Sequence, residues 1–240
     1  MRSPRFLISR GDALYISGRF SKALVFYSRA LELLERRGGH ELELKIRCLN
    51  KVAEACLQQG FLCRGECAAI RALNISYRQG LREGGCTIRT HEILGLIYQA
   101  QEKYCKAEHM FSAAVSLTRR VVGVGGGTLA ITMNRLAVVV AKQQRFGEAI
   151  AILRGAIEIF EGIPAGFAND LRIALGNIAE LYRWLGYLDI SEVLLRRSQE
   201  RLLDTLEWAR PSCLGTSVSL DYVPREHGWA SDRLSYFATH

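Results

Sequence analysis

The sequence lacks the features that would place it in a membrane or interrupt its helices. No apolar stretch approaches the roughly 18 residues of a membrane-spanning helix, and the longest one, residues 136–141, has the length of a core segment. The four prolines, Pro4, Pro164, Pro211 and Pro224, fall at expected helix starts or beyond the last expected helix. With 49% hydrophobic and 23% charged residues, the composition is that of a globular chain rather than a disordered one.

Groups that would support catalysis are missing too. The five histidines, His40, His91, His109, His227 and His240, show no spacing that would place a nucleophile beside its base. The glycine-rich stretch 123–128 lacks the lysine of a phosphate-binding loop and follows no strand, so we interpret it as a linker. We therefore predict that the protein is not an enzyme and that it has no cofactor, metal ion or small-molecule substrate.

The cysteines give no disulfide framework. There are seven, an odd number, without a Cys-x-x-Cys pair, and we expect free, mostly buried thiols in a reducing compartment. Cys63 and Cys67 lie one helical turn apart, as do Cys105 and His109. If neighbouring helices brought the two pairs together, they would form a zinc ligand set; otherwise they are four unconnected side chains.

Acidic residues are absent from one long stretch. The formal net charge is +8, and no Asp or Glu lies between Glu108 and Glu148. The same stretch carries five basic residues: Arg119, Arg120, Arg135, Lys142 and Arg145. They indicate either a basic patch for an acidic partner or RNA, or an ordinary solvated helix face.

What the sequence does contain is an internal repeat. A pattern of small and large residues begins at Gly11, with Leu14, Gly18, Phe20, Ala23, Tyr27 and Ala30, and it returns from Ala53, Gly95, Ala137 and Ala179. These five starting positions are each 42 residues apart. The spacings keep the patterned residues on one face of each of two helices, and the small residues let the helices approach closely.

The end of the first helix in each repeat has its own pattern. Gly18, Gly60 and Gly186 are expected to cap it in the left-handed conformation that suits glycine. Glu102 and Gln144 stand at this position in the other two repeats, which is a departure from the pattern.

Two segments are the clearest copies of the repeat. They are residues 11–31, which contain Gly11-Asp-Ala-Leu-Tyr15, Gly18-Arg-Phe-Ser-Lys-Ala23 and Tyr27-Ser-Arg-Ala30-Leu31, and residues 177–186. On these residues the chain resembles the tetratricopeptide repeat family, and its long period resembles the subgroup found in kinesin light chains. The resemblance implies an all-α fold, a right-handed α-solenoid of about five helical hairpins. We expect one domain, 1–210, and an irregular C-terminal tail, 211–240.

In the resembled family the first helices of the hairpins line a concave binding surface. Helical spacing then gives the predicted protein-binding groove: Arg5, Tyr15, Arg47, Asn50, Arg89, Asn134 and Arg183. Arg5, Arg47 and Arg89 hold equivalent positions and would form a stripe for carboxylates or phosphates, while the two asparagines would pair with a peptide backbone. The alternative is that the arginines pair with neighbouring carboxylates, because the same face carries as many acids.

We therefore expect a non-catalytic scaffold or adaptor that binds other proteins, as an assembly factor or as a structural subunit of a large complex. Aromatic residues in the tail, Tyr222, Trp229, Tyr236 and Phe237, would anchor it in this protein's own groove or in a partner, unless the tail is disordered. Repeats without obvious polar end caps would also leave apolar surface for a neighbouring subunit. The alternative is an RNA- or ribosome-associated repeat protein that uses the basic stretch.

The first 29 residues carry six basic side chains against Asp12 alone, as in a mitochondrial presequence, although Ser3-Pro4 is typical of the start of a structural helix. We therefore expect a mitochondrial protein, with the cytoplasm as the alternative, and a targeting signal that stays part of the fold. A fluorescent reporter fused to residues 1–30 should accumulate in mitochondria. A uniform cytosolic signal would contradict this.

Overall fold

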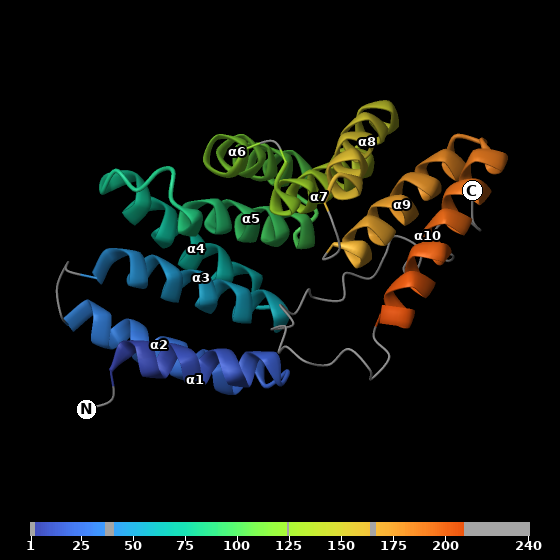
Figure 1. Cartoon of the computed structure of the whole chain (residues 1–240). Helices are drawn as coiled ribbons and strands as arrows, with labels where there is room; N and C mark the ends of the chain where they lie inside the picture. Colours follow the sequence, from blue (N-terminus) through green and yellow to red (C-terminus); the bar gives the residue numbers. More distant parts are fainter. Residues whose placement is uncertain (1–2, 37–40, 124, 164–166, 209–240) are drawn as a thin grey trace, which may run out of the picture. The chain divides into compact units, whose positions relative to one another are not determined.

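The computed structural model describes residues 3–36, 41–123, 125–163 and 167–208, with the backbone alone for residues 201–208. Within these ranges the chain forms helices and no strand, so the predicted all-α fold is confirmed (Figure 1). The helices are α1 (Pro4–Ile16), α2 (Phe20–Arg36), α3 (Leu42–Gln58), α4 (Leu62–Arg78), α5 (Gly85–Ala100), α6 (Tyr104–Val122), α7 (Gly127–Lys142), α8 (Phe146–Glu161), α9 (Ala168–Trp184) and α10 (Leu188–Trp208). None of them is both long enough and apolar enough to span a membrane.

Consecutive helices pair into hairpins: α1 with α2, α3 with α4, α5 with α6, α7 with α8, and α9 with α10. The second helices begin at Phe20, Leu62, Tyr104, Phe146 and Leu188, at the constant spacing of the sequence repeat. The predicted repeat is therefore a structural unit of two helices. The predicted tail, 211–240, and its four aromatic residues lie outside the described residues.

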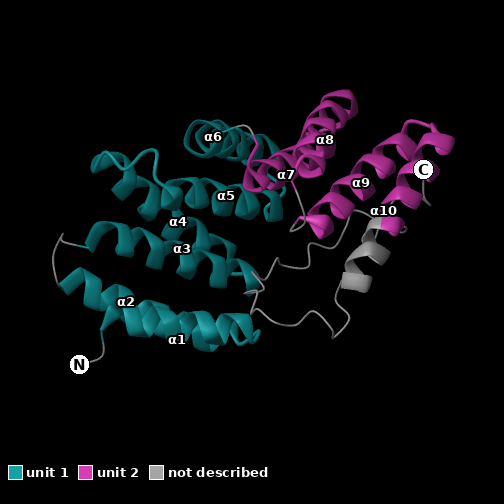
Figure 2. Ribbon diagram, viewed as in Figure 1, with its two compact units in different colours: residues 1–123 teal, residues 124–240 magenta. Residues whose placement is uncertain are grey.

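The hairpins belong to two compact units (Figure 2). Unit 1, residues 1–123, contains α1 to α6, and unit 2, residues 124–240, contains α7 to α10. The boundary lies in the glycine-rich stretch that the sequence predicts as a linker, after Gly123 caps α6. The 42-residue register continues across this point, which is why the sequence predicts one domain over residues 1–210.

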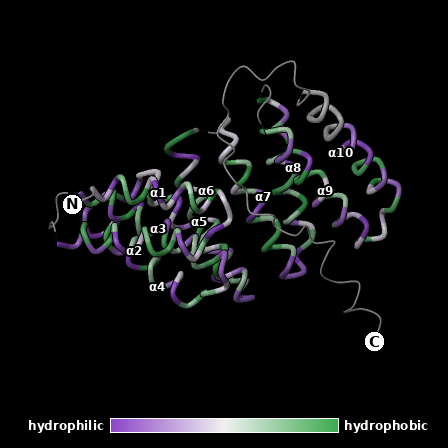
Figure 3. The backbone as a smooth tube through the Cα atoms, turned by 90° about the horizontal axis from the view of Figure 1, so that it is seen from below, coloured by the Kyte–Doolittle hydropathy of each residue, from purple (hydrophilic) through white to green (hydrophobic). Residues whose placement is uncertain are grey.

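In unit 1 each hairpin packs on the next one. Helix α2 contacts α3, α4 contacts α5, and the first helices α3 and α5 also contact each other. The core contains Tyr27, Leu49, Ile93 and Phe111, all fully buried. Hydrophobic and hydrophilic residues alternate along the helices (Figure 3), as expected where one face of each helix is buried.

In unit 2, α9 contacts α7, α8 and α10. The Phe167 ring lies so close to Gly127 that a Cβ on this glycine would come within 2.4 Å of it. Ser198, which replaces the alanine of the other repeats, is buried, and its Oγ donates a hydrogen bond to the carbonyl of Arg172 at 3.1 Å. The serine therefore fits the repeat because its hydroxyl has a partner.

The small residue that opens each repeat limits how closely the two helices of a hairpin approach. A Cβ on Gly11 would lie 2.4 Å from the Tyr27 ring, and a Cβ on Gly95 would lie 2.7 Å from the Phe111 ring. The other repeats have alanine at the first position and a smaller residue at the second: Ala53 and Ala69, Ala137 and Leu153, Ala179 and Leu195. Glycine therefore occurs where the facing residue is aromatic.

The turn between the two helices of a hairpin needs a left-handed residue in every repeat. Gly18, Gly60 and Gly186 have φ values of 72°, 74° and 83°, so the predicted glycine caps are confirmed. Glu102 and Gln144 adopt the same conformation, with φ values of 58° and 65°. The turn geometry is thus kept at a cost of about 1–2 kcal/mol per non-glycine residue.

The start of α1 also matches its prediction. Ser3 is the N-cap residue, and its Oγ accepts a hydrogen bond from the backbone N–H of Phe6 at 3.3 Å. Pro4 follows at the first helical position, where its missing N–H costs nothing. The basic N-terminal segment is therefore part of a packed helix from Pro4 onward.

Replacing Gly95 by alanine should destabilise the protein by about 1–3 kcal/mol, because the added methyl group overlaps the Phe111 ring. Adding Phe111→Leu should recover part of this loss, since Ala137 and Leu153 hold the same two positions in the fourth repeat. Urea denaturation would measure both variants. Gly176→Ala is the matched control, because nothing lies within 4 Å of its new Cβ. If the double variant lost as much stability as Gly95→Ala and Phe111→Leu lose separately, added together, this pairing would be contradicted.

Candidate functional site

A groove of about 590 Å³ lies between α1 and the start of α3, on the first helices of two neighbouring hairpins. Its lining residues are Arg5, Ile8, Ser9, Asp12, Glu41, Leu42, Glu43, Leu44 and Arg47. Arg5 and Arg47, two of the three arginines in the predicted stripe, therefore share one groove. Glu41 and Glu43 are not among the predicted groove residues, because the helical face predicted from the sequence begins at residue 47.

The groove combines an apolar floor with charged walls. Ile8 is buried, whereas Arg5 and Arg47 are exposed. The Asp12 carboxylate is held in place because Tyr27 Oη donates a hydrogen bond to its Oδ1 at 2.7 Å. Burial and then this hydrogen bond raise the pKa of Tyr27 above its ordinary value, so the phenol remains a donor. The groove thus has an acidic group held in place by a hydrogen bond, beside two exposed guanidinium groups.

The two groove arginines differ from the third member of the stripe. Among the described residues, neither Arg5 nor Arg47 makes an ion pair with a carboxylate. Arg47 instead contacts the thiol of Cys86, whose pKa is raised by burial although Arg47 lowers it. Both guanidinium groups therefore keep donors for a ligand.

Arg89 belongs to a chain of ion pairs that joins the first helices of unit 1. Lys51 Nζ lies 3.5 Å from Asp12 Oδ1 and 3.6 Å from Glu54 Oε2. Arg89 donates to Glu54 at 2.7 Å and to Glu92 at 3.0 Å. Burial lowers the pKa of Arg89, but the carboxylates of Glu54 and Glu92 raise it by more. The pKa of Arg89 therefore lies above its ordinary value. For Arg89 the alternative prediction, pairing with neighbouring carboxylates, is therefore the correct one.

Lys51, which links α1 to the rest of this ion-pair chain, is not among the predicted groove residues. Lys51 lies one helical turn after Arg47 and three residues before Glu54, so all three share a face of α3. This spacing was visible in the sequence. What the sequence did not show is that Asp12 of the preceding repeat lies within reach of Lys51.

The two predicted groove asparagines have structural partners. Asn50 is buried, its Nδ2 donates to the carbonyl of Cys86 at 2.9 Å, and its Oδ1 accepts from Thr90 Oγ1 at 2.9 Å. In unit 2, Asn134 Oδ1 accepts from Asn177 Nδ2 at 3.0 Å. Each amide therefore joins the first helices of neighbouring repeats, which differs from the predicted pairing with a peptide backbone.

The remaining two predicted groove residues do not line the groove. The Tyr15 ring packs edge-on against Phe20, with 5.0 Å between ring centroids, and Lys51 lies above it. Arg183, in unit 2, makes an ion pair with Glu180 at 2.5 Å. The side chains that the structure brings together for a ligand are thus Arg5, Asp12 and Arg47.

The predicted basic patch is not one uniform surface. Arg119 and Arg120 belong to unit 1, whereas Arg135, Lys142 and Arg145 belong to unit 2. Arg135 is only 9% exposed, which corrects its assignment to a surface patch. Two other members are paired with acids: Arg120 with Glu83 at 3.0 Å and Arg145 with Glu148 at 2.5 Å. This pairing reduces the positive potential that a polyanion would meet.

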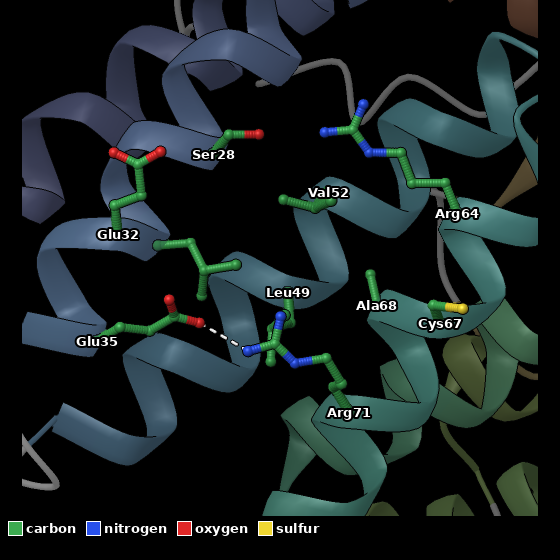
Figure 4. A pocket seen from close by; sticks show the side chains of 10 residues that line it. Ser28, Glu32, Glu35, Leu49, Val52, Arg64, Cys67, Ala68 and Arg71 are labelled. Carbon is green, nitrogen blue, oxygen red and sulfur yellow. Dashed lines mark hydrogen bonds and ion pairs between the residues drawn. The ribbon is translucent and has the colours of Figure 1, made fainter.

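A second groove of about 290 Å³ lies between α2, α3 and α4 (Figure 4). Leu49 and Val52 lie at its base, Glu35 borders it from α2, and Arg71 borders it from α4. Glu35 and Arg71 form an ion pair at 2.6 Å across this groove. Its most prominent charges are therefore used to hold the second helices of two hairpins together.

The four residues of the possible zinc site do not converge. Cys63, Cys67 and Cys105 are exposed, and in the described part of the chain no three His, Cys, Asp or Glu side chains are placed to hold a metal ion. The six cysteines of the described residues are free, as predicted, but the expectation that most are buried is wrong for them, because only Cys48 and Cys56 of these six are fully buried. Burial raises the pKa of Cys48 to about 12, so its thiol stays protonated.

His91, the most buried candidate for acid–base chemistry, has a structural role. Its Nδ1 lies 2.9 Å from the carbonyl of Thr87 and therefore carries the proton, and Nε2 accepts from Tyr77 Oη at 3.4 Å. Burial lowers the pKa of His91, the Thr87 carbonyl opposes this, and His109 lowers it further. A neutral imidazole thus joins α4 to α5, and neither of its partners is a nucleophile with a base.

Comparison with known proteins connects this geometry to a family. Residues 86–162 match the model of the family described as tetratricopeptide repeat. A comparison with curated protein sequences gives no match.

Several solved structures share the fold. The structure of BtubC (BKLC) from P. vanneervenii has a TM-score of 0.76 and 20% identity, over 89% of this chain and 85% of that one. A putative kinesin light chain from Podosopora anserina with nearly identical TPR-like repeats has a TM-score of 0.72 and 14% identity, over 85% and 99%. A Rap protein complexed with Competence and Sporulation Factor has a TM-score of 0.67 and 20% identity, over 85% and 56%.

The stability of the protein should fall in mild acid because of His91. Its folded-state pKa lies below the ordinary value of about 6.5, so the unfolded chain binds the proton more readily. Its contribution is therefore complete above about pH 7 and is lost as the pH falls below about 6.5, by at most about 1.4 kcal/mol per pH unit. Urea midpoints between pH 7.5 and 5.5 would show this decline.

The variant His91→Gln should flatten the decline, because it removes the buried titrating group. His109→Gln is the control, since His109 is exposed and its removal should leave most of the decline in place. An unchanged pH profile in His91→Gln would assign the decline to other groups.

Proposed function

We propose that this tetratricopeptide repeat protein is a non-catalytic scaffold that binds an extended, carboxylate-bearing segment of another protein in the groove between α1 and α3. The family is supported by the match over residues 86–162 and by the fold shared with kinesin-light-chain-like repeat structures. The observation that carries the proposal is the pair of exposed arginines in one groove, Arg5 and Arg47, neither of which is neutralised by a described carboxylate.

The chemistry of the groove suits a peptide better than a polyanion. Guanidinium groups bind carboxylates through paired, charge-assisted hydrogen bonds, and Ile8 gives an apolar floor for a side chain between them. Asp12, Glu41 and Glu43 border the same groove and would repel a continuous row of phosphates. A segment with alternating carboxylates and apolar or cationic residues fits this arrangement.

Comparison with a ligand-bound relative of the fold supports this choice. The Rap protein of similar fold was obtained as a complex with Competence and Sporulation Factor. A protein of this fold can therefore bind a further molecule. For this chain we extend the proposal to a role as an assembly factor or as a structural subunit of a larger complex, in mitochondria.

RNA association has less support. The basic stretch that suggested it includes a buried arginine, Arg135, and two arginines paired with acids, Arg120 and Arg145. Nuclease treatment before affinity purification and mass spectrometry would separate the two readings, since partners of a protein-binding scaffold remain attached.

The double substitution Arg5→Glu and Arg47→Glu should strongly weaken the binding of acidic peptides. Peptides selected on the wild-type protein from a random library should be enriched in Asp and Glu. Their affinity should fall at least roughly 100-fold in the double variant, because two charge-assisted pairs of about 1.5–3 kcal/mol each are lost. Titration calorimetry with the selected peptides would measure this.

Arg29→Glu with Arg78→Glu is the matched control. Both arginines are exposed on second helices of unit 1, so the net charge changes equally while the groove is untouched. If both double variants lost the same affinity for the peptides, the effect would come from net charge alone, and the proposal would be contradicted. Selection of peptides without acidic residues would also contradict it. Circular dichroism would confirm that both variants are folded.

A further inference from the structure

The second groove, between α2, α3 and α4, lies at a point where the other repeats have a large side chain. Ala68 lines this groove from α4 and is buried. The equivalent positions of the other repeats hold Phe26, Met110, Ile152 and Leu194. Phe26 and Met110 are partly buried against the core of unit 1. The groove therefore lies at the one repeat in which this side chain is short.

The next pair of hairpins in unit 1 shows what stands at the same positions elsewhere. There Met110 takes the place of Ala68. Tyr77 takes the place of Glu35, and its ring packs edge-on against His91 with 6.3 Å between ring centroids. The packing of neighbouring hairpins therefore does not require an open space at this point.

One pair of charges in the groove is explained by the repeat itself. Glu35 and Arg71 form an ion pair at 2.6 Å. The equivalent positions of unit 2 hold Glu161 and Arg197, which are also paired. This pair therefore joins neighbouring second helices in both units, and it does not account for the other charged groups of the groove.

Those other charged groups are Glu32 and Arg64. They are exposed and border the groove from opposite sides, Glu32 from α2 and Arg64 from α4 (Figure 4). Among the described residues, neither makes a hydrogen bond or an ion pair with another side chain. Leu49 and Val52 lie at the base of the groove. A carboxylate and a guanidinium group thus stand on either side of an apolar base.

The size and charge of the groove favour one kind of ligand. Its volume of about 290 Å³ is at the lower end of the range for ligand pockets, about 300–1,000 Å³, so it suits a single large side chain. The carboxylates of Glu32 and Glu35 disfavour a nucleic acid or an anionic lipid, because they repel phosphate groups. An anchor residue in a pocket with a polar rim is the usual centre of a protein–protein contact.

We propose that this groove is a second protein-docking site, which takes one apolar anchor residue from a segment of a partner protein. The anchor, a Leu, Ile, Met or Phe, occupies the space left by the short side chain of Ala68. A basic residue of the segment pairs with Glu32, and an acidic residue pairs with Arg64. The site lies on second helices and is independent of the groove between α1 and α3. Unit 1 then holds two different segments, one on its first helices and one on its second helices.

The substitution Ala68→Met tests the site by filling it with the residue that the third repeat has at this position, so folding should be retained. Peptides from a random library are first depleted on Ala68→Met and then selected on the full wild-type chain. The selected peptides should carry a large apolar residue with a basic residue on one side and an acidic residue on the other. Fluorescence anisotropy should show that they bind Ala68→Met at least roughly tenfold more weakly, because the anchor is excluded.

Arg64→Glu is a second variant, which leaves the groove open. It changes an exposed residue, so its folding does not depend on how a methionine fits at position 68. The selected peptides should bind it at least roughly tenfold more weakly, because a charge-assisted pair becomes a repulsion. Replacing the acidic residue of the peptide by lysine should restore binding to this variant, which a purely structural role of Arg64 would not produce.

Two controls separate this site from net charge and from the first groove. Arg78→Glu has the same charge change on the same helix, outside the lining of the groove, and should bind the selected peptides as the wild type does. Arg5→Glu with Arg47→Glu should also bind them unchanged. The two docking sites therefore succeed or fail independently of each other.

Four results would overturn the proposal. The first is that no peptide survives the depletion on Ala68→Met. The second is that the surviving peptides lack an apolar anchor or bind Arg64→Glu as tightly as the wild type. The third is that they lose affinity for Arg5→Glu with Arg47→Glu, which would assign them to the first groove. The fourth is self-association of the wild type that Ala68→Met removes, which would make a second copy of this chain the occupant. Circular dichroism would confirm that each variant is folded.

Discussion

The close approach of two helices at one small residue is the contact on which each hairpin of this protein depends. Where the facing residue is aromatic, as in Tyr27 and Phe111, the chain has glycine, because a single methyl group would overlap the ring. Where the facing residue is smaller, alanine is enough. The size of the facing residue therefore limits the size of the residue that opens the repeat, and the left-handed turn residue then sets the direction of the second helix.

The contacts between repeats explain which polar groups remain for a ligand. In unit 1 the first helices are joined to one another by the hydrogen bond between Asn50 and Thr90 and by the ion pair of Arg89 with Glu54. Arg89 also pairs with Glu92. These groups are partly or fully buried, where an unpaired charge or amide would be costly. Arg5 and Arg47 are not used in this way, and they border the groove between α1 and α3. The binding surface is thus the part of the first-helix face that repeat packing leaves unpaired.

Sequence reasoning predicted the helices and their register well, but the groove only in part. The repeat could be predicted from the sequence because it depends on small residues at a constant spacing of 42. These residues are Gly11, Ala53, Gly95, Ala137 and Ala179. The helical face also placed Arg5 and Arg47 together. The same reasoning treated Arg89 and Asn50 as equivalent to them, because repeat positions show where a side chain points and not which neighbour it meets. For the same reason, Lys51 was not included among the groove residues, and the buried Arg135 was assigned to a surface patch.

By itself, the sequence determined an all-α fold of repeated two-helix hairpins, since small residues and left-handed turns at a constant period leave few other ways to bury the apolar faces. Only the tertiary structure decided which arginines make no ion pair with a described carboxylate and which of the described cysteines are buried. Each of these depends on distances between side chains far apart in the chain. Periodicity fixes the side of a helix, but the charge, hydrogen bond or solvent met there is fixed by the neighbouring helix.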